Sequence, residues 1–164
     1  MTNKKIVRAF LRYYQEHDYQ GMHGLLDDRV KFLDYLYKIE GESVKAMWHW
    51  YCVPDEYRPW PIDVPNIKIK EVSGDTVEAS YRVCYLFGKK RRPLDYYIDS
   101  HFTVSNGKIV EQRDHFGNIN ESEFLLLACG LPLRWQKLVP LFRHGLRIIA
   151  RMKLRKFMLR KDKA

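Results

Sequence analysis

The chain has 164 residues, of which 46% are hydrophobic and 14% aromatic, a composition that predicts one folded globular domain and excludes a disordered chain. It contains no apolar run approaching the ~18 residues that a membrane-spanning helix needs, and its first residues lack the features of a secretory signal. Its three cysteines, Cys52, Cys84 and Cys129, have no metal-ligand spacing, so we expect a protein of the reducing cytoplasm without a metal site.

The net charge of +9 is concentrated at the end of the chain. From Arg134 onward there are 11 Lys and Arg against one acid, whereas residues 1–133 carry 18 basic and 19 acidic side chains. A nucleic-acid-binding surface requires basic residues over the face that meets the phosphates. The distribution therefore argues against nucleic acid as a partner.

Apolar residues recur with the period of a helix at the start of the chain and with the period of a strand further on. We expect the chain to open with a helix that has Ile6, Val7, Phe10, Leu11 and Tyr14 on its apolar face and ends near His17 or Asp18. A short helix that carries Met22, Leu25 and Leu26 should follow, then a strand over 29–37 with Val30, Phe32 and Asp34 on one face, and, after a break at Gly41, a helix over 43–51. Residues 53–65 contain four prolines and are expected to form a loop. With Tyr57 and Trp60, this loop is either a lid over a cavity or a rigid surface connection.

The middle of the chain is typical of an antiparallel meander. We expect strands over residues 67–72, 76–87, 94–104 and 108–116, the last two joined by a tight turn at Ser105-Asn106-Gly107. Helices followed by long strands and then a final helix predict an α+β fold, with helices packed on one face of a strongly bent, mainly antiparallel sheet. The cavity of such a cone is the default site for a small apolar molecule.

Several residues, in order, resemble the nuclear transport factor two-like superfamily, which includes SnoaL-like polyketide cyclases, ketosteroid isomerases and limonene epoxide hydrolase. They are Asp27 and Asp28, Asp34 at the end of the first strand, Gly41, and the closing strand NGKIVEQRDHF. The resemblance implies a cone-shaped α+β barrel over residues 1–130, followed by a basic helical extension over residues 131–164. It also implies a homodimer.

The resemblance to limonene epoxide hydrolase is carried by Arg113-Asp114-His115-Phe116. It implies that Asp114 is the catalytic Asp of the final strand and that Arg82 is the catalytic Arg. Cys84 occupies the position of the second Asp, and a thiol does not replace a carboxylate base. Ketosteroid isomerase is matched at Asp34, near that family's proton-shuttling Asp. Its two oxyanion-hole donors fall on Phe10 and Ser100, and losing such donors costs ~10²–10³-fold each.

The candidate catalytic residues are therefore Asp34, Asp114, Arg82 and His49, each with a structural alternative. Asp114 is either an inward-facing carboxylate or an Asp that caps a turn. Arg82, if it faces inward, needs a partner, for which Asp114 is the obvious candidate. Asp34 is either a base or an exposed acid at the rim.

His49, in the aromatic segment Trp48-His49-Trp50-Tyr51, is either a proton shuttle or a helix-surface residue. Cys84 is either an activated thiol or a small buried hydrophobe. We expect no cofactor. The residues expected to line the cavity are Phe10, Phe32, Trp48, Cys84, Tyr96, Ser100, Gln112 and Phe116.

Residues 138–159 have the pattern of a basic amphipathic helix, with Arg143, Arg147, Arg151 and Arg155 at every fourth position. Three alternatives remain: the helix packs on the cone, lies on an anionic membrane surface, or grips another macromolecule.

The leading hypothesis is a cone that binds a small apolar molecule and carries out acid–base chemistry of the lyase, isomerase or hydrolase kind. The competing hypothesis is a non-catalytic ligand-binding or interaction module. Its final helix would dock to a partner or to the inner membrane surface.

Overall fold

The structure is a computed structural model that describes residues 2–55, 58, 60–87, 91–117, 122–124, 126 and 132–161. Its centre is a six-stranded sheet in the order β2-β1-β6-β5-β4-β3, in which β1 and β6 are parallel and the other neighbours antiparallel. The strands are β1 (Leu26–Leu33), β2 (Lys38–Glu40), β3 (Lys68–Ser73), β4 (Thr76–Phe87), β5 (Arg92–Ser105) and β6 (Lys108–Phe116).

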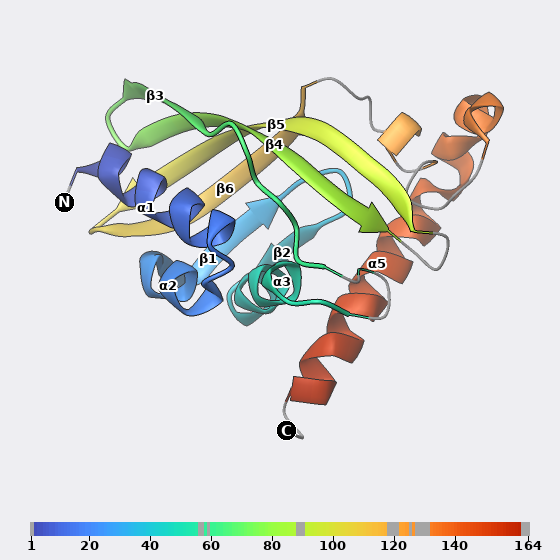
Figure 1. Ribbon diagram of the computed structural model, residues 1–164, viewed down its shortest axis with the longest axis horizontal. Coiled ribbons are helices and arrows are strands. Elements are labelled where there is room, and N and C mark those ends of the chain that lie inside the picture. Colours follow the sequence, from blue (N-terminus) through green and yellow to red (C-terminus); the bar gives the residue numbers. More distant parts are fainter. Residues whose placement is uncertain are drawn as a thin grey trace.

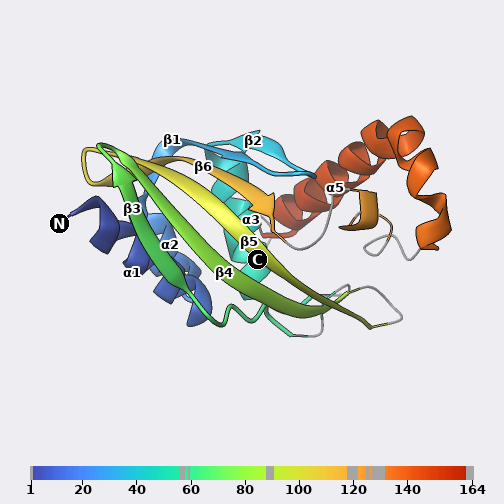
Figure 2. The same cartoon turned by 90° about the horizontal axis from the view of Figure 1, so that it is seen from above.

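Helices cover one face of this curved sheet, which stays open between its edge strands (Figures 1 and 2). They are α1 (Asn3–Gln15), α2 (Tyr19–Leu25) and α3 (Glu42–Cys52). The 3-10 helix η1 (Leu133–Leu138) and the long helix α5 (Val139–Lys161) follow, and α5 extends beside α3. The predicted α+β architecture is confirmed. The predicted domain boundary at residues 130 and 131 lies outside the described residues.

The first two helices form where the apolar spacing and the capping residues agree. Thr2 caps α1 by accepting a hydrogen bond from the Lys5 N–H at 3.4 Å, and Asp18 caps α2 by accepting one from the Gly21 N–H at 2.9 Å. The helix α1 buries the predicted face of Ile6, Val7, Phe10, Leu11 and Tyr14 against the sheet.

The strand predicted over residues 29–37 is wrong, because it is two strands joined by a turn. Strand β1 ends at Leu33, and β2 begins at Lys38. The Asp34 carboxylate accepts hydrogen bonds from the backbone N–H groups of Leu36 (2.7 Å) and Tyr37 (2.5 Å). These hydrogen bonds stabilise the turn between β1 and β2, because a short polar side chain can satisfy the N–H groups of a turn. The alternation of apolar and polar residues alone does not reveal this turn.

The inner face of the sheet follows the predicted alternation on β5, where Tyr96, Ser100 and Phe102 are buried. The hairpin at residues 105–107 is confirmed, with Asn106 and Gly107 at positive φ. On β6 the register shifts: Thr103 pairs with Glu111 and Val104 with Ile109, which leaves Val110 unpaired as a bulge. Ile109 therefore faces the core, whereas strict alternation along residues 108–116 predicts that Val110 shares the inner face of Gln112, Asp114 and Phe116; that prediction is wrong at Val110.

The end of the proline-rich loop is a rigid connection. Asp63 and Cys84 exchange backbone hydrogen bonds, and the Arg82 N–H donates to the Pro65 carbonyl at 3.1 Å. Ile62 and Val64 are buried in the core. Trp60 is 65% exposed, and Tyr57 lies outside the described residues.

Candidate functional site

A buried hydrogen-bond network lies on the inner face of the sheet and joins three strands. Asp114 of β6 accepts hydrogen bonds from Ser100 Oγ of β5 (2.5 Å), Gln112 Nε2 (2.9 Å) and the Tyr81 hydroxyl of β4 (3.3 Å). Ser100 Oγ also lies 3.0 Å from the Tyr81 hydroxyl oxygen. Strand register brings them together, because Ser100 is the direct partner of Asp114 across β5 and β6.

Asp114 is the carboxyl around which this network is built. Its side chain points into the core and its residue is only 5% exposed, so the predicted inward orientation is confirmed. Burial raises the pKa of Asp114 to about 6, while the hydrogen bonds from Ser100, Gln112 and Tyr81 oppose that rise. A carboxyl with this pKa gains and loses a proton close to neutral pH, as a general acid or base must.

Strand register places aromatic residues on both sides of Asp114 along the inner face: Phe116 follows it on β6, and Phe102 of β5 pairs with Gln112. The deep aromatic cluster consists of Phe10, Phe32, Trp48 and Phe102, with edge-to-face contacts of 5.3 Å between Phe10 and Trp48 and 5.7 Å between Phe32 and Trp48. The outer aromatic cluster consists of Tyr35, Tyr96, Phe116 and Phe124, with ring centroids 4.5–5.3 Å apart.

These two clusters contain most of the residues expected to line the cavity. Phe10, Phe32, Trp48, Tyr96, Ser100, Gln112 and Phe116 are all buried. Their contact with a ligand stays a prediction. Sequence reasoning missed Tyr81, although the alternation of β4 places it on the inner face.

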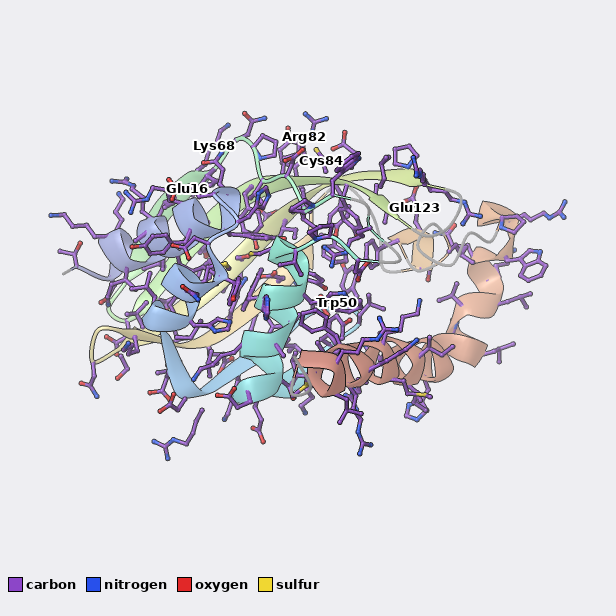
Figure 3. All side chains as sticks on the ribbon, turned by 60° about the horizontal axis from the view of Figure 1, so that its bottom comes forward. Glu16, Trp50, Lys68, Arg82, Cys84 and Glu123 are labelled. Atoms are coloured by element: carbon purple, nitrogen blue, oxygen red, sulfur yellow. The ribbon has the colours of Figure 1, made fainter. Side chains whose placement is uncertain are left out.

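The structure corrects the predicted inward orientation of Arg82 and Cys84. Val77, Ala79, Tyr81 and Val83 are the buried residues of β4, so the residues between them face outward. Arg82 forms a two-point ion pair with Asp95 at the surface and does not pair with Asp114. Figure 3 shows Arg82 and Cys84 on the side of the sheet away from the helices. Cys84 Sγ lies beside the same Asp95, 3.6 Å from its Oδ1. The resemblance placed Arg82 and Cys84 in the cavity, whereas the period-two alternation of β4 places them on the face opposite Tyr81 and Val83. The structure agrees with the alternation.

Asp34 is a second carboxyl with a raised pKa. Burial and the charge of Asp114 raise the pKa of Asp34 to about 7, while hydrogen bonds from Tyr37 and Leu36 and the charge of Arg147 oppose the rise. Its hydrogen bonds also give it a structural task in the turn, and its role as a base stays a prediction.

His49 belongs to the side of α3 that faces other helices. Its ring stacks on Tyr19 of α2, with centroids 3.7 Å apart, and meets Phe157 of α5 edge to face at 5.2 Å. The adjacent Trp48 turns toward the deep aromatic cluster instead. His49 is therefore packed between helices and is not the helix-surface residue of the structural alternative, and its role as a proton shuttle stays a prediction.

Arg58 is a buried cation that sequence reasoning did not single out. It forms an ion pair with Asp55 at 3.6 Å and donates hydrogen bonds to the carbonyls of Tyr51 (3.3 Å) and Trp50. Its guanidinium carbon lies 5.4 Å from the ring centroids of both aromatic residues. A buried Arg is stable only with such partners. Trp50 and Tyr51 lie at the end of α3, and Asp55 lies beyond it, three residues before Arg58.

Buried tyrosines add neutral donors to the interior. Burial raises the pKa of Tyr14, Tyr51 and Tyr85 above the usual value, so their hydroxyls stay protonated. The Tyr85 and Tyr96 hydroxyl oxygens lie 3.3 Å apart. Among the described residues, the buried Trp48 Nε1 and Gln112 Oε1 make no hydrogen bond within the protein.

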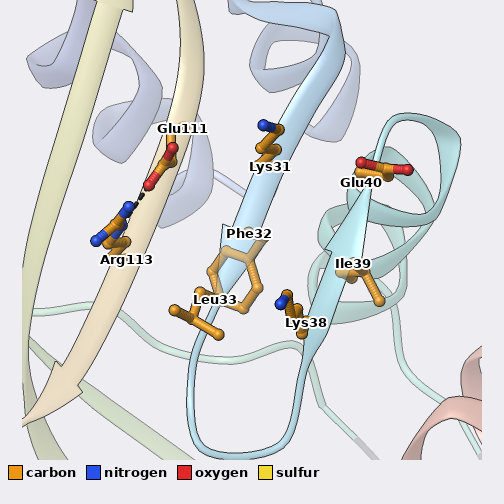
Figure 4. Close-up of a pocket in the computed structure, with 8 residues that line it drawn as sticks. All are labelled: Lys31, Phe32, Leu33, Lys38, Ile39, Glu40, Glu111 and Arg113. Atoms are coloured by element: carbon orange, nitrogen blue, oxygen red, sulfur yellow. Dashed lines mark hydrogen bonds and ion pairs between the residues drawn. The ribbon is translucent and has the colours of Figure 1, made fainter.

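A hollow of about 570 Å³ lies on the other side of the sheet, over β1, β2 and β6 (Figure 4). Its polar lining is of mixed charge: Lys31, Lys38, Glu40, Glu111 and Arg113. Glu111 and Arg113 pair with each other there. Within the described part of the chain, no group of His, Cys, Asp and Glu residues is arranged to hold a metal ion.

Solved structures with the same arrangement of elements are found at low sequence identity. A candidate polyketide cyclase from Pseudomonas putida has 14% identity and a TM-score of 0.61, covering 72% of this chain and 93% of its own. An NTF2-like protein of unknown function from Burkholderia pseudomallei has 17% identity and a TM-score of 0.61, covering 78% of this chain and 98% of its own.

The chain has the NTF2-like fold. TerC, co-crystallised with polyporic acid, shares this fold at 14% identity and a TM-score of 0.56, covering 70% of this chain and 91% of its own. No family model matches the chain, and no curated protein does. The NTF2-like fold predicted from the sequence is confirmed, and it positions β4, β5 and β6 so that Asp114 lies inside the curved sheet.

Proposed function

We propose that this NTF2-like protein binds a small, largely apolar ring compound beside Asp114 and transfers a proton to or from it. The single observation that carries the proposal is the buried Asp114 carboxyl, held by neutral donors between two aromatic clusters, with a pKa raised to about 6. Aromatic surroundings suit an apolar ring, and the carboxyl supplies the proton-transfer group. TerC, co-crystallised with polyporic acid, offers a precedent for such a ligand in this fold.

The chemistry is general acid–base catalysis. Ionised Asp114 accepts a proton from an acidic C–H or O–H group of the ligand, and the hydrogen bonds from Ser100 and Gln112 hold the carboxylate in position. Negative charge that develops on the ligand is stabilised by hydrogen bonds from tyrosine hydroxyls that stay neutral. Protonated Asp114 then returns the proton at another atom, which completes an isomerisation or an elimination.

A non-catalytic binding protein is the second candidate. It is favoured by one observation: both Asp114 oxygens already have hydrogen-bond partners within the protein. A structural role in a polar network needs no substrate proton. The two candidates therefore differ in whether Asp114 exchanges a proton with a bound molecule.

The test uses 2-tetralone, an aromatic ketone with acidic C–H groups, as a probe in deuterated buffer. We expect the protein to accelerate exchange of these hydrogens, observed by NMR, by roughly 10²-fold or more, the usual contribution of a positioned base. Asp114→Asn should abolish the acceleration. Asp99→Asn is the matched control, because Asp99 is an exposed Asp on the outer face of neighbouring β5 and should leave exchange unchanged.

The outcomes separate the candidates. If 2-tetralone quenches tryptophan fluorescence saturably without accelerated exchange, the binding function stands and the catalytic one is wrong. If the exchange is accelerated equally by the Asp114→Asn variant, Asp114 is not the base. An exchange rate that rises as pH increases through about 6 and then levels off supports Asp114 as the ionising group.

A further inference from the structure

Helix α5 exposes a stripe of large apolar side chains to solvent. Leu141 is 82% exposed, Ile148 44%, Met152 64% and Leu159 56%. Their spacings of seven, four and seven residues place them on one side of a helix. Of the ten large apolar side chains exposed in the described part of the chain, seven lie between residues 135 and 159. The exposed apolar surface is therefore concentrated on this helix and the turn before it.

The opposite side of α5 attaches the helix to the cone. Leu154 is buried, and the Phe157 ring lies 6.0 Å from the Trp50 ring. Arg147 Nε donates a hydrogen bond to the Tyr35 carbonyl at 2.9 Å. These contacts fix the rotation of the helix, and the exposed apolar stripe lies on the side of α5 away from them. One helix thus has two apolar sides, and the cone covers one of them.

Basic residues border the exposed stripe. Arg151, Arg155 and Lys156 are all exposed, and residues 132–161 contain no Asp or Glu. A surface of apolar side chains flanked by cations complements a layer in which anionic headgroups lie above acyl chains. Contact with a second copy of the chain would bring two such basic helices together, and their like charges would repel each other. A nucleic acid would leave the apolar stripe without a partner.

We propose that α5 lies flat on an anionic lipid surface, with Leu141, Ile148, Met152 and Leu159 inserted between headgroups and the flanking basic side chains paired with lipid phosphates. No helix in the described ranges is long and apolar enough to cross a membrane, so the contact is peripheral. The proposal does not depend on the proposed proton transfer. The test uses the full chain and its point variants. Helix α5 is not deleted, because Leu154 and Phe157 pack against the body.

The test is co-sedimentation of the full chain with vesicles of phosphatidylcholine alone or mixed with phosphatidylglycerol. We expect binding only to the mixed vesicles, weakened by salt. The stripe variant, with Ile148→Ser, Met152→Ser and Leu159→Ser, should bind at least about tenfold more weakly because it loses inserted apolar area. Replacing Arg155 and Lys156 by Gln should weaken binding by about fivefold per charge.

The matched control is Leu33→Ser, which makes the same kind of change at an exposed apolar position on the outer face of the sheet. It should leave vesicle binding unchanged. All these positions are exposed, so thermal unfolding followed by circular dichroism should stay close to wild type. Equal binding by the stripe variant and the wild type would overturn the proposal. So would failure of the wild type to bind the mixed vesicles at low salt.

Two other results identify a different occupant and overturn the proposal. In the first, the wild type binds no vesicles but self-associates in light scattering, and the stripe variant does not self-associate. That result assigns the stripe to a second copy of the chain. The second is binding of duplex DNA or RNA that survives the stripe substitutions and disappears with the charge substitutions, again without vesicle binding.

Discussion

Asp95 and Asp114 are the same kind of residue on neighbouring strands, but they face opposite sides of the sheet. Asp95 is on the outer face, where its hydrogen bonds with Arg82 lower its pKa. Asp114 is on the inner face, where burial raises its pKa to about 6 and its partners are neutral donors. The outer carboxyl stays ionised and pairs with a cation. The inner one can exchange a proton, so the face of the strand determines the chemistry of the residue.

The largest difference between the faces should appear in stability, at two adjacent residues of β1. Phe32 is 3% exposed and packs on Trp48, whereas Leu33 is 41% exposed on the outer face. Phe32→Ala should lower the free energy of unfolding by about 3–5 kcal/mol, and Leu33→Ala by less than about 1 kcal/mol. Urea denaturation measures both. Equal losses would show that the two faces are not distinguished by burial.

The pH dependence of stability should differ between the two carboxyls. Folded Asp114 holds its proton up to about pH 6, whereas the unfolded carboxyl loses it near 3.8. The folded state therefore binds more protons in this window, and the free energy of unfolding decreases as pH rises through it, by about 3 kcal/mol for this group. Asp34, with a pKa raised to about 7, acts in the same direction.

Asp114→Asn should flatten this decrease, as measured by urea denaturation at several pH values. Asp95→Asn serves as the control, because the lowered pKa of Asp95 contributes stability that is present above the unfolded pKa and lost on acidification. An unchanged slope for the Asp114→Asn variant would contradict the raised pKa.

A smaller effect should follow from Tyr81→Phe, which removes the hydroxyl 3.3 Å from Asp114. That hydrogen bond lowers the pKa of Asp114, so its loss should raise the pKa further. The cost in stability should be about 1 kcal/mol, the usual net value of one hydrogen bond. NMR titration of the Asp114 carboxyl carbon measures the shift. Tyr97→Phe, on the outer face, should leave that titration where it is in the wild type.

The smallest effect should come from Arg82→Gln. The Arg82–Asp95 pair is exposed to solvent, which screens its charges, so the free energy of unfolding should hardly change. The exchange of 2-tetralone hydrogens should also stay as in the wild type, because Arg82 faces away from Asp114. Loss of that exchange in this variant would return Arg82 to the site and contradict the outward orientation.

The fold could be predicted in large part, because helix and strand periods are local properties of the chain. The first helix, the strands of the meander and the Asn106-Gly107 turn all follow from spacing and turn chemistry. The turn at Asp34 was missed because alternation continues through it in sequence. The bulge at Val110 was missed because it is a property of the pairing between β5 and β6.

By itself, the sequence determined the α+β architecture and the basic amphipathic character of the last helix, since each follows from period, turn residues and charge. Only the tertiary structure decided that Tyr81 and Ser100 are the partners of Asp114, that Arg82 pairs with Asp95, and that α5 leaves a second apolar side uncovered. The physical reason is that partner choice and burial depend on strand register and on packing between distant segments, which no local pattern encodes.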